Sequence, residues 1–368
     1  MRFTIEVSEL NKALSGNVAS RSTSEIHEHV LLEIVAFGEP ELQRLLLTST
    51  NFGLQYGVKV PVESVEVDGA CTALPRQLKN AIAGLQGVVE IKLINGKLSL
   101  TQPIGASARK RRVALDTLPT KDFPTMDQKA SVEHHMSNDQ TSALFRAMRQ
   151  VEYAMATKDV RYYLNGMLLG QGFVAATDGH RLACCKLDFL PDQDIIIPRE
   201  AVSKIIDILE DGGAMYICNE GGTLSLVSDN YELATNLINH RYPSIENHIR
   251  PIDPLNTITI NKADMANVMD RAGRLETTKG GKGYLSSGLS IKSCAGMIRI
   301  QGKRLDDYVV CDADKDDIEI GVDANYVAEM LSSIESDTVI WERYNKETRQ
   351  LFRSPGSETL HVIMPMRL

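Results

Sequence analysis

The sequence lacks the cysteine patterns that stabilise small secreted domains or bind metals. Its six cysteines form no C-x-x-C pair and show no spacing typical of a disulfide framework. We therefore expect reduced, inert thiols, most of them buried. The N-terminus has no signal-peptide pattern, and no apolar run approaches the ~20 residues that span a bilayer. These absences predict a cytoplasmic protein that does not enter a membrane.

Motifs of catalysis and metal binding are missing as well. No G-x-x-x-x-G-K-[ST] phosphate loop is present, so Gly280–Gly283 is expected to be a flexible loop and the chain is not expected to consume ATP. Asp178 and His180 would suit a hydrolase, but no G-x-S-x-G or catalytic-cysteine context supplies a nucleophile. The pairs His27-x-His29 and His134-His135 have no Cys or carboxylate partner at ligand spacing. We therefore predict no enzyme activity, no metal and no cofactor.

What the sequence does contain is material for several packed cores. The 368 residues exceed what one core usually supports, so two or three domains are expected, and 43% hydrophobic residues suffice to fill them. The net charge of −8 keeps the chain soluble and alone argues against nucleic acid as a partner. A net charge does not reveal its distribution, however, and a ring can be acidic outside and basic along its bore.

An internal repeat organises the chain. Three segments read as a strand, then Pro or Asp, then an amphipathic helix: Leu74–Leu85, Ile197–Leu209 and Val322–Ile334. Pro suits the first helical turn, and Asp caps the same helix end. The first two helices are followed by similar hairpin halves, Gly96–Leu100 and Gly222–Leu226.

Each copy also contains a second helix with apolar residues at i, i+3/4 and i+7. Ser8 and Asn261 are the expected caps of the first and third of these helices. The apolar positions are Leu10, Ala13, Leu14 and Val18 in the first copy, Leu144, Met148, Val151 and Met155 in the second, and Met265, Val268, Met269 and Leu275 in the third. We predict an α+β chain of three diverged domains, 1–126, 127–252 and 253–368, with linkers near Phe123–Asp127 and Ile249–Pro254.

Three motifs identify a family. Asp159–Leu168 places an Arg and two Tyr between a helix end and a strand, and Ala176–Leu182 contains an Asp-Gly turn, which between apolar runs predicts a hairpin. Met364–Leu368 is an amphipathic segment that we expect to be packed. Together with Met1–Thr4 and Asp116–Pro124, they closely resemble the bacterial DNA polymerase III beta subunit (beta sliding clamp) family.

The resemblance implies a fold and a function. Three tandem copies of the DNA-clamp (processivity) domain form each chain, and two chains close head to tail into a six-domain ring. The ring encircles double-stranded DNA without reading its sequence and tethers the replicative DNA polymerase. Further implied partners are an ATP-driven clamp loader and repair factors with clamp-binding peptides.

The resemblance also implies a surface groove that receives partner peptides. Its residues here are Arg161, Leu164, Thr177, Gly179, His180, Arg181, Leu182, Pro243, Val362, Met364, Pro365, Met366 and Arg367. Met side chains adapt to varied apolar ligands, which suits a protein with many partners. At the rim this chain has Glu246-Asn247-His248 where the family usually has a basic and an aliphatic residue. The preference of this groove among partner peptides is therefore left open.

Lys and Arg side chains on the helices, with Arg21 in the first loop, are the candidates for sequence-independent contact with DNA phosphates. The main set is Arg21, Arg76, Arg146, Lys158 and Arg199, and the resemblance adds a loop in which Tyr162 and Tyr163 project toward DNA. Further candidates on the same helices are Lys12, Arg149, Lys262, Arg271 and Arg274. The alternatives are a solvated charge for each cation and core packing for each Tyr.

The basic run Arg109–Arg112 resembles a nucleic-acid patch, but the family places this strand edge against the third domain of a second subunit. The expected interface residues are Lys110, Arg112, Val113, Leu115, Asp306 and Asp307. Where the family has a glutamate-rich run, this chain has Lys303–Asp307. A clamp-like adaptor or inhibitor that binds clamp-binding peptides without closing a ring is therefore the alternative function.

Overall fold

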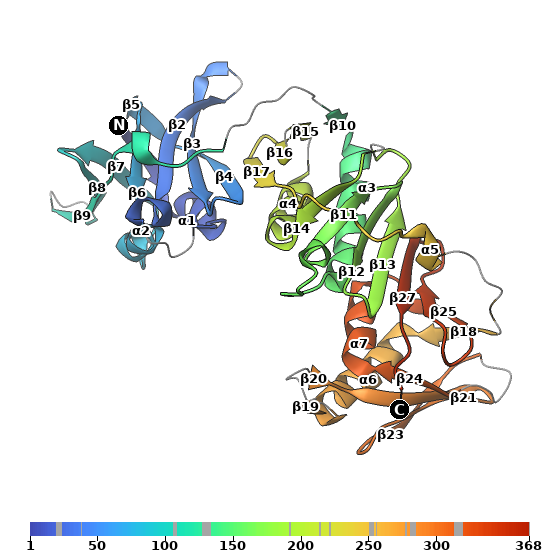
Figure 1. Ribbon diagram of the computed structural model, residues 1–368. Helices are drawn as coiled ribbons and strands as arrows, with labels where there is room; N and C mark the ends of the chain where they lie inside the picture. The colour runs from blue at the N-terminus through green and yellow to red at the C-terminus, as the bar shows by residue number, and fades with distance from the viewer. Residues whose placement is uncertain are drawn as a thin grey trace. The chain divides into compact units, whose positions relative to one another are not determined.

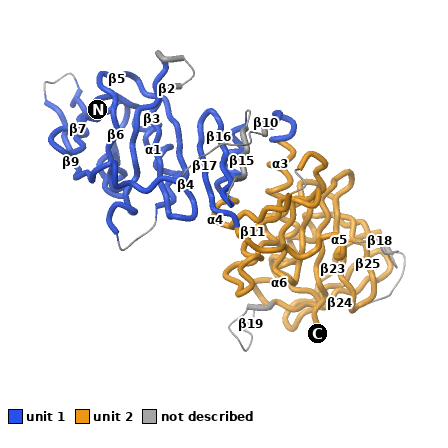
Figure 2. The backbone as a smooth tube through the Cα atoms, turned by 45° about the horizontal axis from the view of Figure 1, so that its top comes forward, with its two compact units in different colours: residues 1–141, 203–237 blue, residues 142–202, 238–368 orange. Residues whose placement is uncertain are grey.

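The structure is a computed structural model of a mixed α+β chain (Figure 1). It describes residues 1–19, 24–37, 39–105, 109–126, 134–190, 193–212, 215–220, 222–249, 254, 256–276, 278–279, 285–312 and 319–367. The chain divides into two compact units, each built from two stretches of sequence (Figure 2). Unit 1 comprises Met1–Thr141 with Ser203–Leu237, and unit 2 comprises Ser142–Val202 with Ile238–Leu368.

Unit 1 contains two antiparallel sheets. The smaller has the order β5-β1-β7-β8-β9: Ser64–Val67, Arg2–Glu6, Val88–Ile94, Lys97–Pro103 and Lys110–Asp116. The larger has the order β10-β15-β16-β17-β4-β3-β2-β6: His134–Met136, Met215–Glu220, Thr223–Val227, Tyr231–Asn236, Leu54–Pro61, Glu39–Thr50, Val30–Phe37 and Ala70–Ala73. The expected hairpins at Gly96 and Gly222 are confirmed as β7–β8 and β15–β16.

Unit 2 contains a second eight-stranded sheet, which positions the site described below. Its order is β14-β11-β12-β13-β27-β26-β25-β18: Ile195–Pro198, Gly166–Gly170, Phe173–Thr177, Arg181–Lys186, Thr359–Ile363, Gln350–Arg353, Thr338–Arg343 and Asn256–Asn261. The pairing of β13 with β27, Leu182 opposite Val362, joins the middle of the chain to its last strand. A four-stranded sheet has the order β23-β22-β21-β24: Asp306–Val310, Met297–Gln301, Gly288–Cys294 and Glu319–Asp323. The two-stranded β19–β20 pair is Thr278–Lys279 with Leu285–Ser286.

The helices begin close to the expected positions. They are α1 Val7–Ser15, α2 Pro75–Ile82, α3 Asn138–Val151, α4 Arg199–Asp211, α5 Glu246–Ile249, α6 Lys262–Glu276 and α7 Ala324–Ser333. Short 3-10 turns are η1 Glu25–Glu28, η2 Thr120–Asp122, η3 Glu152–Ala154 and η4 Tyr162–Leu164.

Two of the predicted caps are confirmed. Asn261 Oδ1 accepts a hydrogen bond from the backbone N–H of Asp264 at 3.1 Å, and Asp323 Oδ1 accepts one from Asn325 at 2.9 Å. At the start of α3, Ser137 and Gln140 satisfy each other's backbone N–H groups reciprocally, as in a capping box.

Three details of the helix prediction are wrong. α1 starts directly out of strand β1 with Glu6 at the cap position, so Ser8 lies inside the first turn instead of capping it. Val18 and Met155 follow the ends of α1 and α3. Leu275 is 43% exposed, because the last turn of α6 instead buries Glu276, whose carboxylate accepts the backbone N–H groups of Lys303 and Arg304. Local spacing could not reveal that contact, which comes from the distant β22–β23 hairpin.

Candidate functional site

A three-residue turn between β12 and β13 forms the centre of the candidate site. Asp178 Oδ1 accepts the backbone N–H groups of His180 at 2.8 Å and Arg181 at 3.0 Å. Thr177 Oγ1 accepts the N–H of Gly179 at 3.0 Å and donates to the carbonyl of Arg181 at 2.6 Å. Gly179 has φ +90°, which suits glycine. The hairpin expected from the Asp-Gly turn is confirmed, with Thr177 opposite Leu182.

The Arg161 guanidinium lies directly against this turn. It donates to both carboxylate oxygens of Asp159 at 3.0 and 2.8 Å, and to the carbonyl of Asp178 at 3.0 Å. These hydrogen bonds hold the pKa of Asp159 at about 2. A Cβ at Gly179 would lie 2.9 Å from Arg161 Nη1, so only glycine leaves space for the guanidinium.

Arg181 points into the protein interior instead. Its side chain is 8% exposed and bonds Asp178 Oδ2 at 3.0 Å and Glu329 Oε2 of α7 at 2.7 Å. The guanidinium carbon lies 4.6 Å from the ring centre of Tyr326 and 5.2 Å from that of Tyr153. The Tyr153 hydroxyl is 3.0 Å from Nδ1 of buried His361, and burial lowers the pKa of His361 to about 4. Arg181 therefore fixes the turn to α7, which follows it by more than a hundred residues.

Beside the turn lies a cavity of about 280 Å³. Nine of the thirteen residues that the resemblance assigned to a peptide groove line it: Arg161, Leu164, Thr177, Gly179, Arg181, Leu182, Pro243, Val362 and Met364. Four lining residues were not predicted for the groove: Tyr163, Ile245, His248 and Arg349.

The other four predicted groove residues do not line this cavity. His180 is exposed, its ring stacks 6.2 Å from that of Tyr326, and its carbonyl accepts the N–H of Met364 at 2.9 Å. Pro365, Met366 and Arg367 line a second cavity of about 1010 Å³ with Glu319, Gly321, Asn345, Lys346 and Glu347. The Met366 N–H bonds the Gly321 carbonyl at 2.9 Å, so the terminal segment is packed as expected.

The Tyr pair is divided between two environments. Tyr162 is 53% exposed, whereas Tyr163 stacks on His240 with ring centres 4.3 Å apart and lines the cavity. Both lie in the 3-10 turn η4, just before β11. The sequence showed that Ile245 and His248 follow Pro243 closely, but no signal indicated that Arg349 belongs to the same wall.

The candidate DNA contacts occupy varied positions. Arg76, Arg146 and Lys158 are exposed, while Arg199 donates to the carbonyls of Met155 and Ala156 at 2.9 and 3.3 Å. Arg21 lies outside the described residues. Among the additional candidates, Arg149 pairs with Glu152, Arg271 pairs with Asp307, and Lys262 Nζ donates to the Ile334 carbonyl. Helices α1–α4, α6 and α7 together carry as many acidic as basic residues.

The expected interface residues lie on two sheet edges. Among the described strands, β9 is bonded only to β8, and β23 is an edge strand bonded to β22. Val113 of β9 is 38% exposed and Leu115 is buried. Asp306 already pairs with Arg299 through both carboxylate oxygens, at 2.8 and 2.6 Å. Val310, at 70% exposure, and Tyr308, at 49%, present apolar surface on β23.

The described residues were also compared with the requirements for a metal site and for a membrane-spanning helix. The described residues contain no group of three or more His, Cys, Asp and Glu side chains placed to hold a metal ion. No helix in that part of the chain is long and apolar enough to cross a membrane.

The sequence is similar to known beta subunits of DNA polymerase III. The family described as DNA polymerase III beta subunit, central domain, matches residues 139–244. The chain is 27% identical to the beta sliding clamp of Pseudomonas aeruginosa over 389 residues and 28% identical to that of Escherichia coli K12 over 386 residues, with all of each chain covered.

Solved structures agree with the sequence matches. The crystal structure of the DNA polymerase III subunit beta from P. aeruginosa has a TM-score of 0.83 and 27% identity, with both chains fully covered. A sliding clamp from the same organism bound to griselimycin has a TM-score of 0.85, 27% identity and the same coverage. By these full-length matches, together with the motifs at 159–168, 176–182 and 364–368, the chain is similar over its whole length to the DNA polymerase III beta subunits, and it functions as a DNA sliding clamp in replication.

Proposed function

We propose that the cavity beside the β12–β13 turn is the groove through which this clamp holds its partners. The observation that carries the proposal is that predicted residues from four separate segments, near 161–164, 177–182, 243 and 362–364, line one cavity. Apolar side chains such as Leu164, Leu182 and Val362 would bury the apolar residues of a partner peptide. DNA polymerase, an ATP-driven clamp loader and repair factors are the partners we propose.

Tethering explains why such a protein needs no chemistry of its own. A polymerase held at the groove is confined near the primer end, and this can add 10²–10⁴ in avidity, as an order of magnitude, without new contacts to DNA. The clamp we propose is non-catalytic, works in the cytoplasm and consists of three domains, 1–126, 127–252 and 253–368.

We further propose that DNA is held by sequence-independent phosphate contacts from Arg76, Arg146, Lys158 and Arg199. Each cation that contacts phosphate steepens the salt dependence of affinity by ~0.9 in slope. The equal numbers of acidic and basic residues on the helices suggest that these contacts are weak, which permits sliding.

Ring closure is proposed to pair β9 of one chain with β23 of a second. Both are edge strands with unpaired backbone groups on one side among the described residues, and such edges are templates for another strand. One observation favours the adaptor alternative, because Asp306 and Asp307 already pair with Arg299 and Arg271 of their own chain.

Native mass across a dilution series distinguishes the two. The ring predicts about twice the 40.7 kDa of one chain, persisting at low concentration, because an obligate dimer is stable only through its interface. A mass of one chain at every concentration would contradict the ring and favour the adaptor.

The groove is tested separately by one matched pair of substitutions. Met364→Ala removes a cavity-lining side chain that is 43% exposed, and Met297→Ala removes a comparably exposed one, at 39%, on β22. We expect M364A to weaken polymerase binding about tenfold or more and M297A to leave it unchanged, with DNA retention equal in both. Equal polymerase binding by the two variants would refute the groove assignment.

A further inference from the structure

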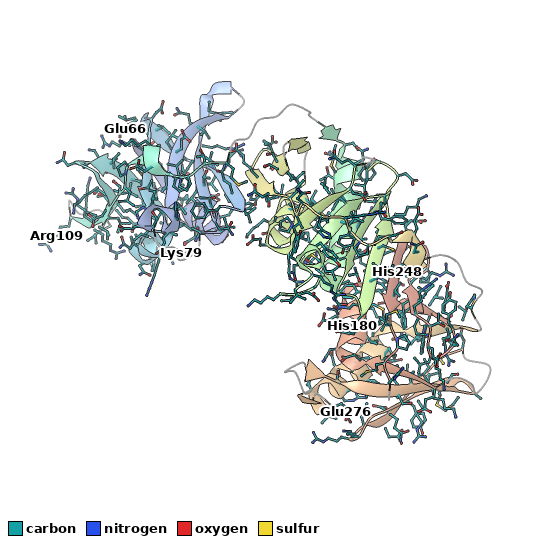
Figure 3. All side chains as sticks on the ribbon, in the orientation of Figure 1. Glu66, Lys79, Arg109, His180, His248 and Glu276 are labelled. Atoms are coloured by element: carbon teal, nitrogen blue, oxygen red, sulfur yellow. The ribbon has the colours of Figure 1, made fainter. Side chains whose placement is uncertain are left out.

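The last turn of helix α6 is bonded to the β22–β23 hairpin in both directions. The Glu276 carboxylate accepts the backbone N–H of Lys303 at 3.1 Å and that of Arg304 at 2.5 Å. In return, Arg304 Nη1 donates to the carbonyl of Leu275 at 3.0 Å. Figure 3 labels Glu276 among the side chains of unit 2. The end of the helix and the turn of the hairpin therefore hold each other in place.

The hairpin turn leaves space for this carboxylate. The Gly302 N–H donates to the Leu305 carbonyl at 2.8 Å and closes the turn. A Cβ at Gly302 would lie 2.6 Å from Cδ of Glu276 and 2.7 Å from its Oε1, so a side chain there would displace the carboxylate. Glu276 is only 6% exposed, and a buried charge is stable only where hydrogen bonds such as these two satisfy it.

The position of the carboxylate is unfavourable for its own helix. A negative charge at the C-terminal end of a helix opposes the helix macrodipole, which favours cations there. The neighbouring Leu275 is 43% exposed, whereas the acid is buried. The compensation for both costs comes from the hairpin, where the carboxylate binds two backbone N–H groups of the turn.

Further contacts fix the strand that follows the turn. Arg271, earlier in α6, forms an ion pair with Asp307, whose Oδ1 also accepts the N–H of Tyr308 at 2.8 Å. Just after β23, Cys311 forms a β-bridge with Ile260 of β18. The strand is therefore held by α6 at its beginning, by β22 along its length and by β18 at its end.

These contacts position the edge at which ring closure is proposed. A second strand adds to such an edge through a row of backbone hydrogen bonds. These bonds weaken steeply when donor and acceptor are misaligned, so a displaced edge strand loses several of them together. The affinity between two chains therefore depends on how firmly β23 is held before they meet.

We propose that Glu276 is a positioning residue for ring closure, because its carboxylate holds the 302–305 turn, and with it β23, where a second copy of this chain can add its β9 strand. Arg271 assists through Asp307. The inference rests on the proposed ring and adds to it a buried helix side chain that sets the affinity of the dimer.

Native mass across a dilution series measures the dimer dissociation constant of the full-length wild type and of three variants. Glu276→Gln keeps the size of the side chain but offers one acceptor oxygen in place of two. Gly302→Ala displaces the carboxylate from the other side of the same contact. Asp270→Asn is the matched control, because it removes a 59% exposed acid that pairs with Arg274 of the same helix.

We expect E276Q and G302A each to raise the dissociation constant about tenfold or more, as for a lost charge-assisted hydrogen bond, and D270N to leave it unchanged. The two changes combined should weaken the dimer no more than the stronger of them alone, because both break one contact. Glu276→Asp, which keeps the charge on a shorter side chain, should restore part of the affinity. A merely structural role of Glu276 would lower the urea midpoint and leave the dissociation constant of the folded chains unchanged.

The outcomes separate the inference from the ring. An E276Q dimer as tight as the wild type, or a D270N dimer weakened as much as E276Q, would overturn the inference and leave the ring intact. A wild type with the mass of one chain at every concentration would overturn both. Circular dichroism shows which variants are folded, and either E276Q or G302A suffices for the test.

Discussion

Two regions of unit 2 each contain an Asp–Arg ion pair, but one pair is buried and the other is exposed. At the groove, Asp178 bonds two backbone N–H groups and Arg181, and the Arg181 side chain is only 8% exposed. At the edge strand β23, Asp306 makes an equally good bidentate pair with Arg299, but both side chains are more than a third exposed.

The two regions differ in which of their groups are already bonded before a partner binds. The turn at the groove is already held by the hydrogen bonds of Asp178 and by the Arg181–Glu329 pair, which lowers the ordering cost of binding a partner. The β23 edge has its polar side chains bonded along the sheet and its backbone left for another strand. Substitutions should therefore damage the fold at the groove and damage only assembly at the edge.

The largest effect is expected for Arg181→Ala. The substitution leaves Asp178, whose side chain is 14% exposed, without its guanidinium and opens space between Tyr153 and Tyr326. Removing one member of a buried pair typically costs about 3–5 kcal/mol. We expect a clear drop in the urea concentration at which unit 2 is half unfolded. Hydrogen exchange of the β12 and β13 amides measures this unfolding.

Glu329→Gln is its control. The Glu329 side chain is 52% exposed, so water compensates for the lost charge and the midpoint should move little. If R181A and E329Q were equally stable, the buried contacts of Arg181 with Asp178 and the two Tyr rings would not be what holds the turn.

A somewhat smaller effect is expected from acid. His361 is buried with its pKa lowered from 6.5 to about 4, so as pH falls the unfolded chain takes up this proton before the folded chain does. The contribution is complete above pH 6.5 and is lost between pH 6.5 and 4, up to about 3 kcal/mol. Unfolding free energy measured against pH should slope across that window, and the slope should flatten in His361→Gln. An unchanged slope would show that other groups cause it.

Gly179→Ala ranks third. Its φ of +90° disfavours a side chain, and the new Cβ would displace the Arg161 guanidinium. We expect a loss of about 1–3 kcal/mol and a larger loss of peptide affinity. Gly172→Ala is the matched control, because Gly172 has φ +73° but a Cβ there meets nothing within 4 Å. Equal peptide binding by the two variants would show that the conformation of the β12–β13 turn does not determine peptide affinity.

Local patterns predicted much of this structure, and long-range contacts account for the rest. The Asp-Gly hairpin and the caps Asn261 and Asp323 depend on residues within three positions of one another, so the sequence reveals them. The pairings of β17 with β4 and of β13 with β27 join distant segments, and composition carries no signal for them. The site divides in the same way: the motif residues were found, whereas Arg349 reaches the wall from a turn set by the buried Gln350.

The smallest effect on stability, and the sharpest test of the comparison, is expected for Asp306→Asn. The Arg299–Asp306 pair is exposed, and such pairs contribute little because water and salt screen them. The unfolding midpoint should therefore stay within error, in contrast to R181A. If the β23 edge serves assembly through its backbone and its apolar Tyr308 and Val310, the native mass should also stay unchanged in D306N and fall to that of one chain in Val310→Asp. Dissociation of D306N would instead show that the carboxylate leaves Arg299 to bind the basic β9 strand of the second chain, and the two regions would then differ in stability but not in their use of charge.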